Sequence, residues 1–229
     1  MMNKIVIDNN RILLKKNLTY YLSIEKDVTI DILVSNDIKA KIVIVSQYNN
    51  NINIYLSRNS FLLINSLNKD NNSNINIQLE ENSKIVYNYS VLSNKDSQNE
   101  FCVKHMANNS VSILNNYGIN RNDGKLYFKI DGVIPKNLNK IVCNQNSRII
   151  NFNNGDSKII PDLIIDSNDI IANHAAYVGE IDEHEKFYLA SRGISDMEIE
   201  KLMYRATLLG KMELIEEEEE FNNLINEWW

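Results

Sequence analysis

The chain has 229 residues, of which 44% are hydrophobic, and a formal net charge of −6 at pH 7. This size and composition fit one globular domain, or one domain with an appendage, and exclude a globally disordered protein. Only two cysteines are present, Cys102 and Cys143, so a disulfide framework is excluded too.

Targeting and membrane signals are missing from the sequence. No apolar run approaches the roughly 20 residues of a membrane span, and the N-terminal stretch MMNKIVIDNN lacks the apolar core of a signal peptide. We therefore expect a soluble, cytoplasmic protein with no membrane partner.

Charge is distributed unevenly along the chain. From residue 181 onward there are 13 acidic and 5 basic side chains, a net charge of −8. No basic stripe with interleaved aromatic residues occurs, which argues against a nucleic-acid partner. The acidic run Glu216–Glu220 is predicted to be a solvated helix face or tail.

Residues 1–172 have the pattern of one short strand after another. The segments NINIYL (51–56) and NINIQL (74–79) alternate polar and apolar residues with period two, so one face of each is expected to be buried. The same habit occurs in DVTIDILVS, KAKIVIVSQ, SFLLINSL, SKIVYNYSVL, EFCVKHMA, SVSILNNYGI and KLYFKIDGVI. Ser, Asn and Asp clusters separate these segments, as turns require.

The turn chemistry favours a solenoid over a sandwich. With only 7 Gly and 2 Pro, tight hairpins should be scarce, whereas Asn accepts the left-handed conformation and can stack as ladders. Many short, near-equivalent strands with few hairpins indicate a parallel β-helix, although no fixed repeat period is apparent. A β-sandwich is the alternative.

Beyond residue 180 the period changes to that of helices. Asp182 is a candidate N-cap with Glu185 as its reciprocal partner, and Gly193 suits a helix end in the left-handed conformation. Ser195 then starts a second helix with Glu198 at its third position. The expected division is a β body at 1–179 and a helical subdomain at 180–229.

The helical part also carries the apolar residues that would pack it. Phe187, Tyr188 and Leu189 are expected to give the first helix its apolar face. The second helix has apolar residues at helical spacing, namely Ile199, Leu202, Met203, Ala206 and Leu209. Trp228 and Trp229 are predicted to fold back on the second helix, with an interface as the alternative.

The stretch NHAAYVGEIDEHEKFYLASRGIS (173–195) resembles the C-terminal signature of the SufB/SufD family. These proteins are scaffold components of the SUF iron–sulfur cluster assembly system. The resemblance extends over roughly residues 100–210, whereas residues 1–100 share only the general pattern of short strands with the family. Because the chain is much shorter than usual members, we expect N-terminal coils or an N-terminal helical domain to be missing.

The resemblance implies a fold and partners. The fold would be a right-handed parallel β-helix (solenoid) followed by a small C-terminal α-helical subdomain. That subdomain would dock the ABC-type ATPase SufC, through Phe187, Tyr188, Arg192 and Gly193. The β-helix would pair with a SufB-like protomer or with a second copy, and the sequence does not decide between them. Alternatively, Phe187, Tyr188 and Arg192 lock the helices to the end of the β-helix.

The resemblance also implies a metal ligand. The functional histidine of the SufD branch falls on His174, and imidazole is a suitable iron ligand. The glutamate of the SufB branch falls on Ala175, and Gly155-Asp156 is followed by Ser157 where that branch has cysteine. The chain is therefore SufD-like, and any iron–sulfur cluster would be transient and shared with a partner, with none bound by this chain alone. Cys102 and Cys143 are interpreted as small, buried apolar residues.

The leading functional hypothesis is a non-enzymatic scaffold of iron–sulfur cluster assembly. One alternative is a structural paralogue that docks partners but has lost cluster chemistry. A less favoured alternative is a β-helix enzyme acting on polysaccharide, because the acidic residues of 1–172 are scattered. No Walker-type loop is present, so ATPase activity would have to come from the partner.

Overall fold

The computed structural model describes residues 3–5, 10–152, 155–212 and 218–228. Its fifteen strands pair in parallel and form two sheets. In order, the first sheet contains β1 (Asn3–Lys4), β3 (Thr19–Ile24), β5 (Lys39–Ser46), β7 (Phe61–Lys69), β9 (Lys84–Ser93), β11 (Val111–Asn120), β13 (Asn139–Asn151) and β15 (Asp169–Gly179). The second contains β14 (Asp156–Ile165), β12 (Lys125–Ile134), β10 (Ser97–His105), β8 (Ser73–Leu79), β6 (Asn50–Leu56), β4 (Val28–Val34) and β2 (Arg11–Leu14).

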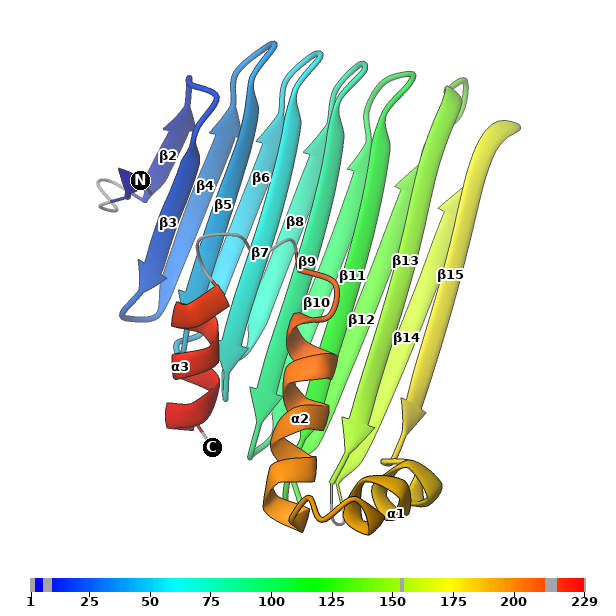
Figure 1. Cartoon of the computed structure of the whole chain (residues 1–229). Helices are drawn as coiled ribbons and strands as arrows, with labels where there is room; N and C mark the ends of the chain where they lie inside the picture. Colours follow the sequence, from blue (N-terminus) through cyan, green and yellow to red (C-terminus); the bar gives the residue numbers. More distant parts are fainter. Residues whose placement is uncertain (1–2, 6–9, 153–154, 213–217, 229) are drawn as a thin grey trace.

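Odd-numbered strands lie in one sheet and even-numbered strands in the other, so each coil of the chain adds one strand to each sheet (Figure 1). This arrangement is a parallel β-helix, as predicted. The β-sandwich alternative is wrong, because a sandwich is built of antiparallel strands joined by hairpins and Greek-key connections.

The coils do have a repeat, but its length changes. Asn53 hydrogen-bonds Asp31 across 22 residues, and Asn76 bonds Asn53 across 23. Further along, Asn115 bonds Asn88 across 27 residues and Asn146 bonds Asn115 across 31. In the last coil Asn173 bonds Asn144 across 29 residues, and this changing step explains why no fixed period can be read from the sequence.

Alternation along the strands builds the core. In β6 every second residue from Asn50 to Leu56 is buried, and Ile52 and Ile54 join an apolar cluster between the two sheets. Larger rings occupy the middle coils, where Tyr89 and Phe101 meet edge-on with centroids 5.0 Å apart. Burying each such side chain stabilises the fold by roughly 1.5–3 kcal/mol, so this interior holds the coils in register.

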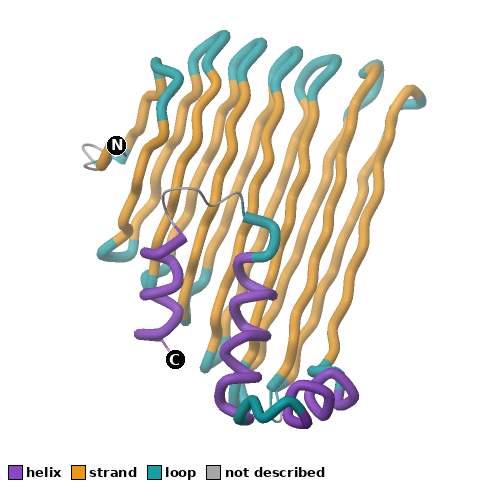
Figure 2. Tube along the Cα trace, in the orientation of Figure 1, coloured by secondary structure: helices purple, strands orange, loops and turns teal. Residues whose placement is uncertain are grey.

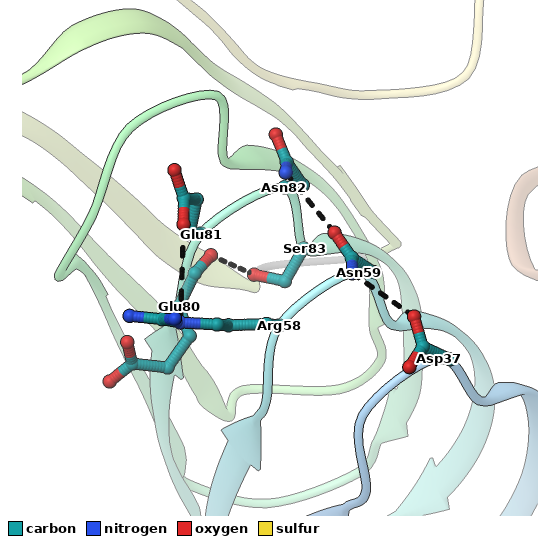
Figure 3. Close-up of polar contacts among 7 residues, drawn as sticks. All are labelled: Asp37, Arg58, Asn59, Glu80, Glu81, Asn82 and Ser83. Carbon is teal, nitrogen blue, oxygen red and sulfur yellow. Dashed lines mark hydrogen bonds and ion pairs between the residues drawn. The ribbon is translucent and has the colours of Figure 1, made fainter.

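Asparagine supplies the left-handed turn positions. Among the described residues, six Asn, two Asp and Lys140 have positive φ, and Asp37, Asn59 and Asn82 occupy equivalent turns of successive coils. Asn82 donates to Asn59 at 3.1 Å, and Asn59 donates to Asp37 at 3.0 Å (Figure 3). Asn tolerates this conformation better than other non-glycine residues, so the ladder explains why so few glycines suffice.

Three helices follow the β-helix: α1 (Glu183–Ser191), α2 (Asp196–Leu209) and α3 (Glu218–Trp228). The Asp182 carboxylate caps α1 by accepting from the backbone N–H of His184 at 2.8 Å. Gly193 follows α1 with φ +85°, and Ser195 and Glu198 form a reciprocal capping box on α2. The predicted starts of α1 and α2 are therefore confirmed, but the reciprocal bond predicted for Glu185 is not formed, because Asp182 accepts from His184 and the capping box occurs on α2.

Helices α2 and α3 pack against the outer face of the eight-stranded sheet (Figure 2). Tyr204 and Leu208 of α2 and Phe221, Ile225 and Trp228 of α3 share one apolar cluster with the sheet residues Val43, Val45, Leu67, Leu92, Ile119 and Ile150. The Ser90 hydroxyl also donates to the carbonyl of Leu208 at 2.5 Å. Trp228 is buried as predicted, and Trp229 lies outside the described residues.

The predicted apolar face of α2 was partly wrong. Ile199 is buried, but Leu202 is 46% exposed because α2 presents Tyr204 to the sheet. Residues two apart on a helix are about 200° apart, so burying Tyr204 turns Leu202 to the opposite side. This orientation leaves an apolar side chain in solvent.

The change from strand to helix falls between Gly179 and Glu183. Whether 1–179 and 180–229 are separate domains stays a prediction. The shared apolar cluster shows that α2 and α3 rest on the sheet rather than standing apart from it.

Candidate functional site

The last coil of the β-helix has two open strand edges. β15 pairs with β13 and β14 pairs with β12, and neither has a second neighbour in the described part of the chain. They are 11 and 10 residues long. Their unpaired backbone N–H and C=O groups form a template on which another strand can add.

These edge strands also expose apolar side chains. Ile171 of β15 is 60% exposed, and Tyr177, Val178, Ile164 and Ile165 are exposed as well. Natural edge strands are usually short, charged or covered, which prevents pairing with another chain. A long apolar edge indicates instead an interaction surface, which we call the terminal-coil edge.

His174 lies on β15, in register with Gln145 of β13. Ala172, two residues earlier, packs inward on the cluster that contains Cys143, so the alternation of a strand places His174 in the same inward row. No further described coil covers this row, and His174 is exposed. The imidazole therefore stands at the open end of the β-helix interior.

The interior behind His174 contains a second histidine that sequence reasoning missed. His105 is fully buried, with Nδ1 2.7 Å from the Ser110 hydroxyl and Nε2 3.0 Å from the Ser112 hydroxyl. Burial lowers the pKa of His105 to about 4, so the ring is neutral near pH 7. The available signal was its position, because His105 continues the buried alternation of Phe101 and Val103.

The two thiols are in different environments. Cys143 is buried beside Ile134 and Ile141, and burial raises the pKa of its thiol. Cys102 is half-buried, and burial together with the nearby Asp131 carboxylate raises the pKa of its thiol. Both groups are therefore held in the thiol form, which is neither a nucleophile nor a good metal ligand.

The predicted partner-binding residues lie together on α1 and at its end. No residue of α1 is buried, and Phe187 and Tyr188 are 74% and 56% exposed. These rings therefore do not lock the helix to the β-helix. Arg192 stacks over Tyr188, 5.0 Å from its centroid, and Gly193 ends the helix.

Next to this helix end is a shallow groove of about 430 Å³, lined by Gly193, Ile194, Glu198, Lys201, Leu202 and Arg205. Met197 and Leu202 of α2 add exposed apolar side chains beside it. We call Phe187, Tyr188, Met197 and Leu202 the α1–α2 surface. The two caps fix the direction of both helices, so this surface is presented by ordered backbone.

Comparison with known proteins explains the combination of these features. A family described as "SUF system FeS cluster assembly, SufBD core domain" matches residues 49–207. The chain belongs to the SufB/SufD family. One curated relative, "Iron-sulfur cluster assembly protein SufD" of Bacillus subtilis (strain 168), is 32% identical over 102 residues. That alignment covers 43% of this chain and 23% of the relative, so the chain spans well under two thirds of its length.

Family membership directs attention to the ligand positions that the resemblance implied. Ala175 is exposed on β15, and the Ser157 hydroxyl donates to the Asn151 side chain at 2.6 Å. Neither offers a carboxylate or thiolate. Among the described residues, no group of three or more His, Cys, Asp and Glu side chains could hold a metal ion.

No helix within the described ranges is both long enough and apolar enough to cross a bilayer. The helices α1 to α3 have 9, 14 and 11 residues.

Proposed function

We propose that this SufB/SufD family member is a non-enzymatic scaffold in iron–sulfur cluster assembly. It docks a SufC-type ATPase through the α1–α2 surface and pairs through the terminal-coil edge with a SufB-like protomer or a second copy. The observation that carries this proposal is the exposure of Phe187 and Tyr188 on a helix with no buried residue. Two adjacent aromatic rings in solvent are typical anchors of a protein interface.

The docking experiment follows from the packing of the helices. Deleting 180–229 would uncover the outer face of the sheet, including Val43 and Leu67, so loss of binding would not be specific. The double substitution Phe187→Ala and Tyr188→Ala avoids this problem, because both rings are exposed. We expect it to weaken capture of a SufC-type ATPase by about a hundredfold or more, as loss of interface hot spots does.

The matched control is Tyr48→Ala, an aromatic that is 45% exposed just before β6. It should leave ATPase capture unchanged. Equal capture by the double variant and the wild type, both with unchanged melting temperature, would contradict docking through α1.

Pairing is tested separately at the terminal-coil edge. Ile171→Lys places a charge on an exposed edge position, where it should oppose addition of another strand. We expect this variant to shift the chain toward monomer, or to lose a SufB-like partner, in sedimentation experiments. An unchanged mass distribution would remove the edge from the proposal without affecting the α1–α2 surface.

For cluster chemistry, His174 is the residue that we propose as a ligand, acting on a cluster shared with the partner. The alternative paralogue that has lost this chemistry is favoured by Ala175 and Ser157 at the other ligand positions. Anaerobic iron and sulfide reconstitution of the complex, with and without His174→Ala, separates the two. Equal iron content and spectra would favour the paralogue.

A polysaccharide-acting enzyme has less support from the geometry. The groove on the seven-stranded sheet contains two carboxylates, Asp27 just before β4 and Glu100 in β10. Three strand spacings separate them, which is about 14 Å. Paired glycosidase carboxylates lie about 5–9.5 Å apart, so these two cannot act on one glycosidic bond.

A further inference from the structure

A second groove, of about 670 Å³, lies between α2 and the outer face of β11, β13 and β15. Its floor contains three side chains in one register row: Tyr117, Arg148 and Tyr177. The Arg148 guanidinium lies 5.0 Å from the centroid of the Tyr177 ring. The two tyrosines therefore flank a cation on a rigid three-strand floor.

Arg148 is exposed, and it forms no ion pair with a carboxylate of the described residues. A guanidinium presents five N–H donors in a fixed fork that fits carboxylate and phosphate groups. Because Arg148 is exposed, these donors can bind the anionic group of a ligand.

The neighbouring row of the floor is an amide ladder that stops inside the groove. Asn115 donates to Asn88 at 2.8 Å, and Asn146 donates to Asn115 at 3.0 Å. The next position in the row, on β15, is Ala175, which has no polar group to continue the ladder. The Asn146 carbonyl oxygen is thus available to accept from a ligand hydroxyl, and the small Ala175 side chain leaves room.

The groove walls add charge of both signs. Lys211 follows the end of α2 and supplies a second cation, while Glu185 of α1 supplies the one carboxylate among the lining residues. Ala206 and Gly210 are small and keep the helix wall open. The charged lining is therefore two cations and one anion, which fits an anion that also carries hydroxyl groups.

We propose that this groove binds a small phosphate ester of a polyol, such as a sugar phosphate or a mononucleotide. Arg148 and Lys211 bind the phosphate, and Asn146 and Glu185 accept hydrogen bonds from the hydroxyls. The tyrosine rings provide flat apolar contact for the rest of the ligand. This site shares Tyr177 with the terminal-coil edge, but it requires neither proposed partner and is therefore tested with the chain alone.

The test is calorimetric titration of the full chain at low salt with ribose 5-phosphate, AMP, inorganic phosphate and adenosine. We expect at least one of the two esters to bind more tightly than inorganic phosphate or adenosine. Arg148→Met should weaken ester binding by about tenfold or more, as expected for loss of a charged hydrogen-bond partner. Arg148→Lys keeps the charge but not the forked donor geometry. Its affinity for the ester should therefore lie between those of the wild type and Arg148→Met.

Controls separate charge from position and from folding. Arg58→Met removes the same charge at a distant turn, where Arg58 lies 3.9 Å from Glu81, and it should leave ester binding unchanged (Figure 3). If Arg148→Met does not fold, Lys211→Met tests the opposite wall of the groove. Three results would each overturn the proposal: no ester binding at millimolar concentration, inorganic phosphate binding as tightly as the esters, or unchanged affinity in folded Arg148→Met and Lys211→Met.

Discussion

The coils from β3 to β9 differ from the coils that follow, although the strand register is continuous. One inward row passes through Ile42, Ile64 and Tyr87 in the first part and through Leu114, Gln145 and His174 in the second. After Leu114, apolar side chains thus give way to polar ones at positions that are equivalent in the sheet.

The two parts also differ in coil length and covering. The step between coils is 22–23 residues near β4 to β8 and reaches 31 between β11 and β13. Helices cover apolar outer-face residues from Val43 of β5 to Ile150 of β13, whereas β15, in the last coil, is exposed along most of its length. The comparison teaches that the uniform coils provide stability, while the enlarged coils carry the residues available to partners and ligands.

The largest expected effect comes from the apolar part of the row. Ile64 is fully buried between the sheets, so Ile64→Ala leaves a cavity and should lower the free energy of unfolding by about 2–5 kcal/mol. Ile171→Ala, at an exposed position of β15, is the control and should change it by less than about 0.5 kcal/mol. Chemical denaturation measures the free energy of unfolding of both variants. Similar decreases would show that the two parts of the β-helix do not differ in their contribution to stability.

The second effect depends on pH and belongs to His105. Its folded pKa of about 4 lies below the ordinary value of 6.5, so the unfolded chain binds a proton first as the pH falls. Stability contributed by the neutral ring is complete above pH 6.5 and is lost as the pH falls toward 4. Between pH 6.5 and pH 4, the free energy of unfolding should fall by about 3 kcal/mol more in the wild type than in His105→Gln. Parallel pH profiles of the two proteins would show that His105 titrates normally.

A smaller effect is expected at the turns of the uniform coils. Asn59 has φ +56° and hydrogen bonds on both sides of the ladder, so Asn59→Ala should destabilise the protein by about 1–2 kcal/mol. Asn59→Gly keeps the backbone conformation and loses only the side-chain bonds. If alanine and glycine cost the same in thermal unfolding, backbone strain is not what asparagine relieves there.

The smallest effect should have the opposite sign. Gln145 is buried and donates to the carbonyl of Asp162 at 3.2 Å, but its Oε1 has no partner among the described residues. Gln145→Leu should therefore be neutral or stabilise the protein by about 1 kcal/mol. A loss above about 1 kcal/mol would mean that the polar interior contributes to stability, which would weaken the contrast.

Much of the fold could be predicted because its signals are local. The segment KLYFKIDGVI coincides with β12, and Ser195 with Glu198 forms the predicted capping box. Period-two alternation and cap chemistry depend on neighbouring residues, so one sequence is enough to read them. The coil length was missed because the step between equivalent residues changes along the chain, from 22 to 31 and then to 29.

The sites were less predictable because they depend on which face of each helix packs against the sheet. The sequence contains Arg148 and Lys211 sixty-three positions apart, and only the docking of α2 on the sheet brings them to one groove. Similarly, the exposure of Leu202 follows from the burial of Tyr204, which helical spacing alone could not rank above it. The partner-binding residues came from resemblance and stay predictions.

The packing of α3 has a consequence for how the molecule unfolds. Solenoid coils contact only their neighbours, so such proteins can lose structure from one end. Here the Tyr21 hydroxyl of β3 bonds Glu220 of α3, and Val43 and Val45 of β5 share a cluster with Trp228. Fraying of the early coils thus requires release of the last helix, which joins distant segments of the polypeptide into one cooperative unit and predicts slow folding through a late long-range closure.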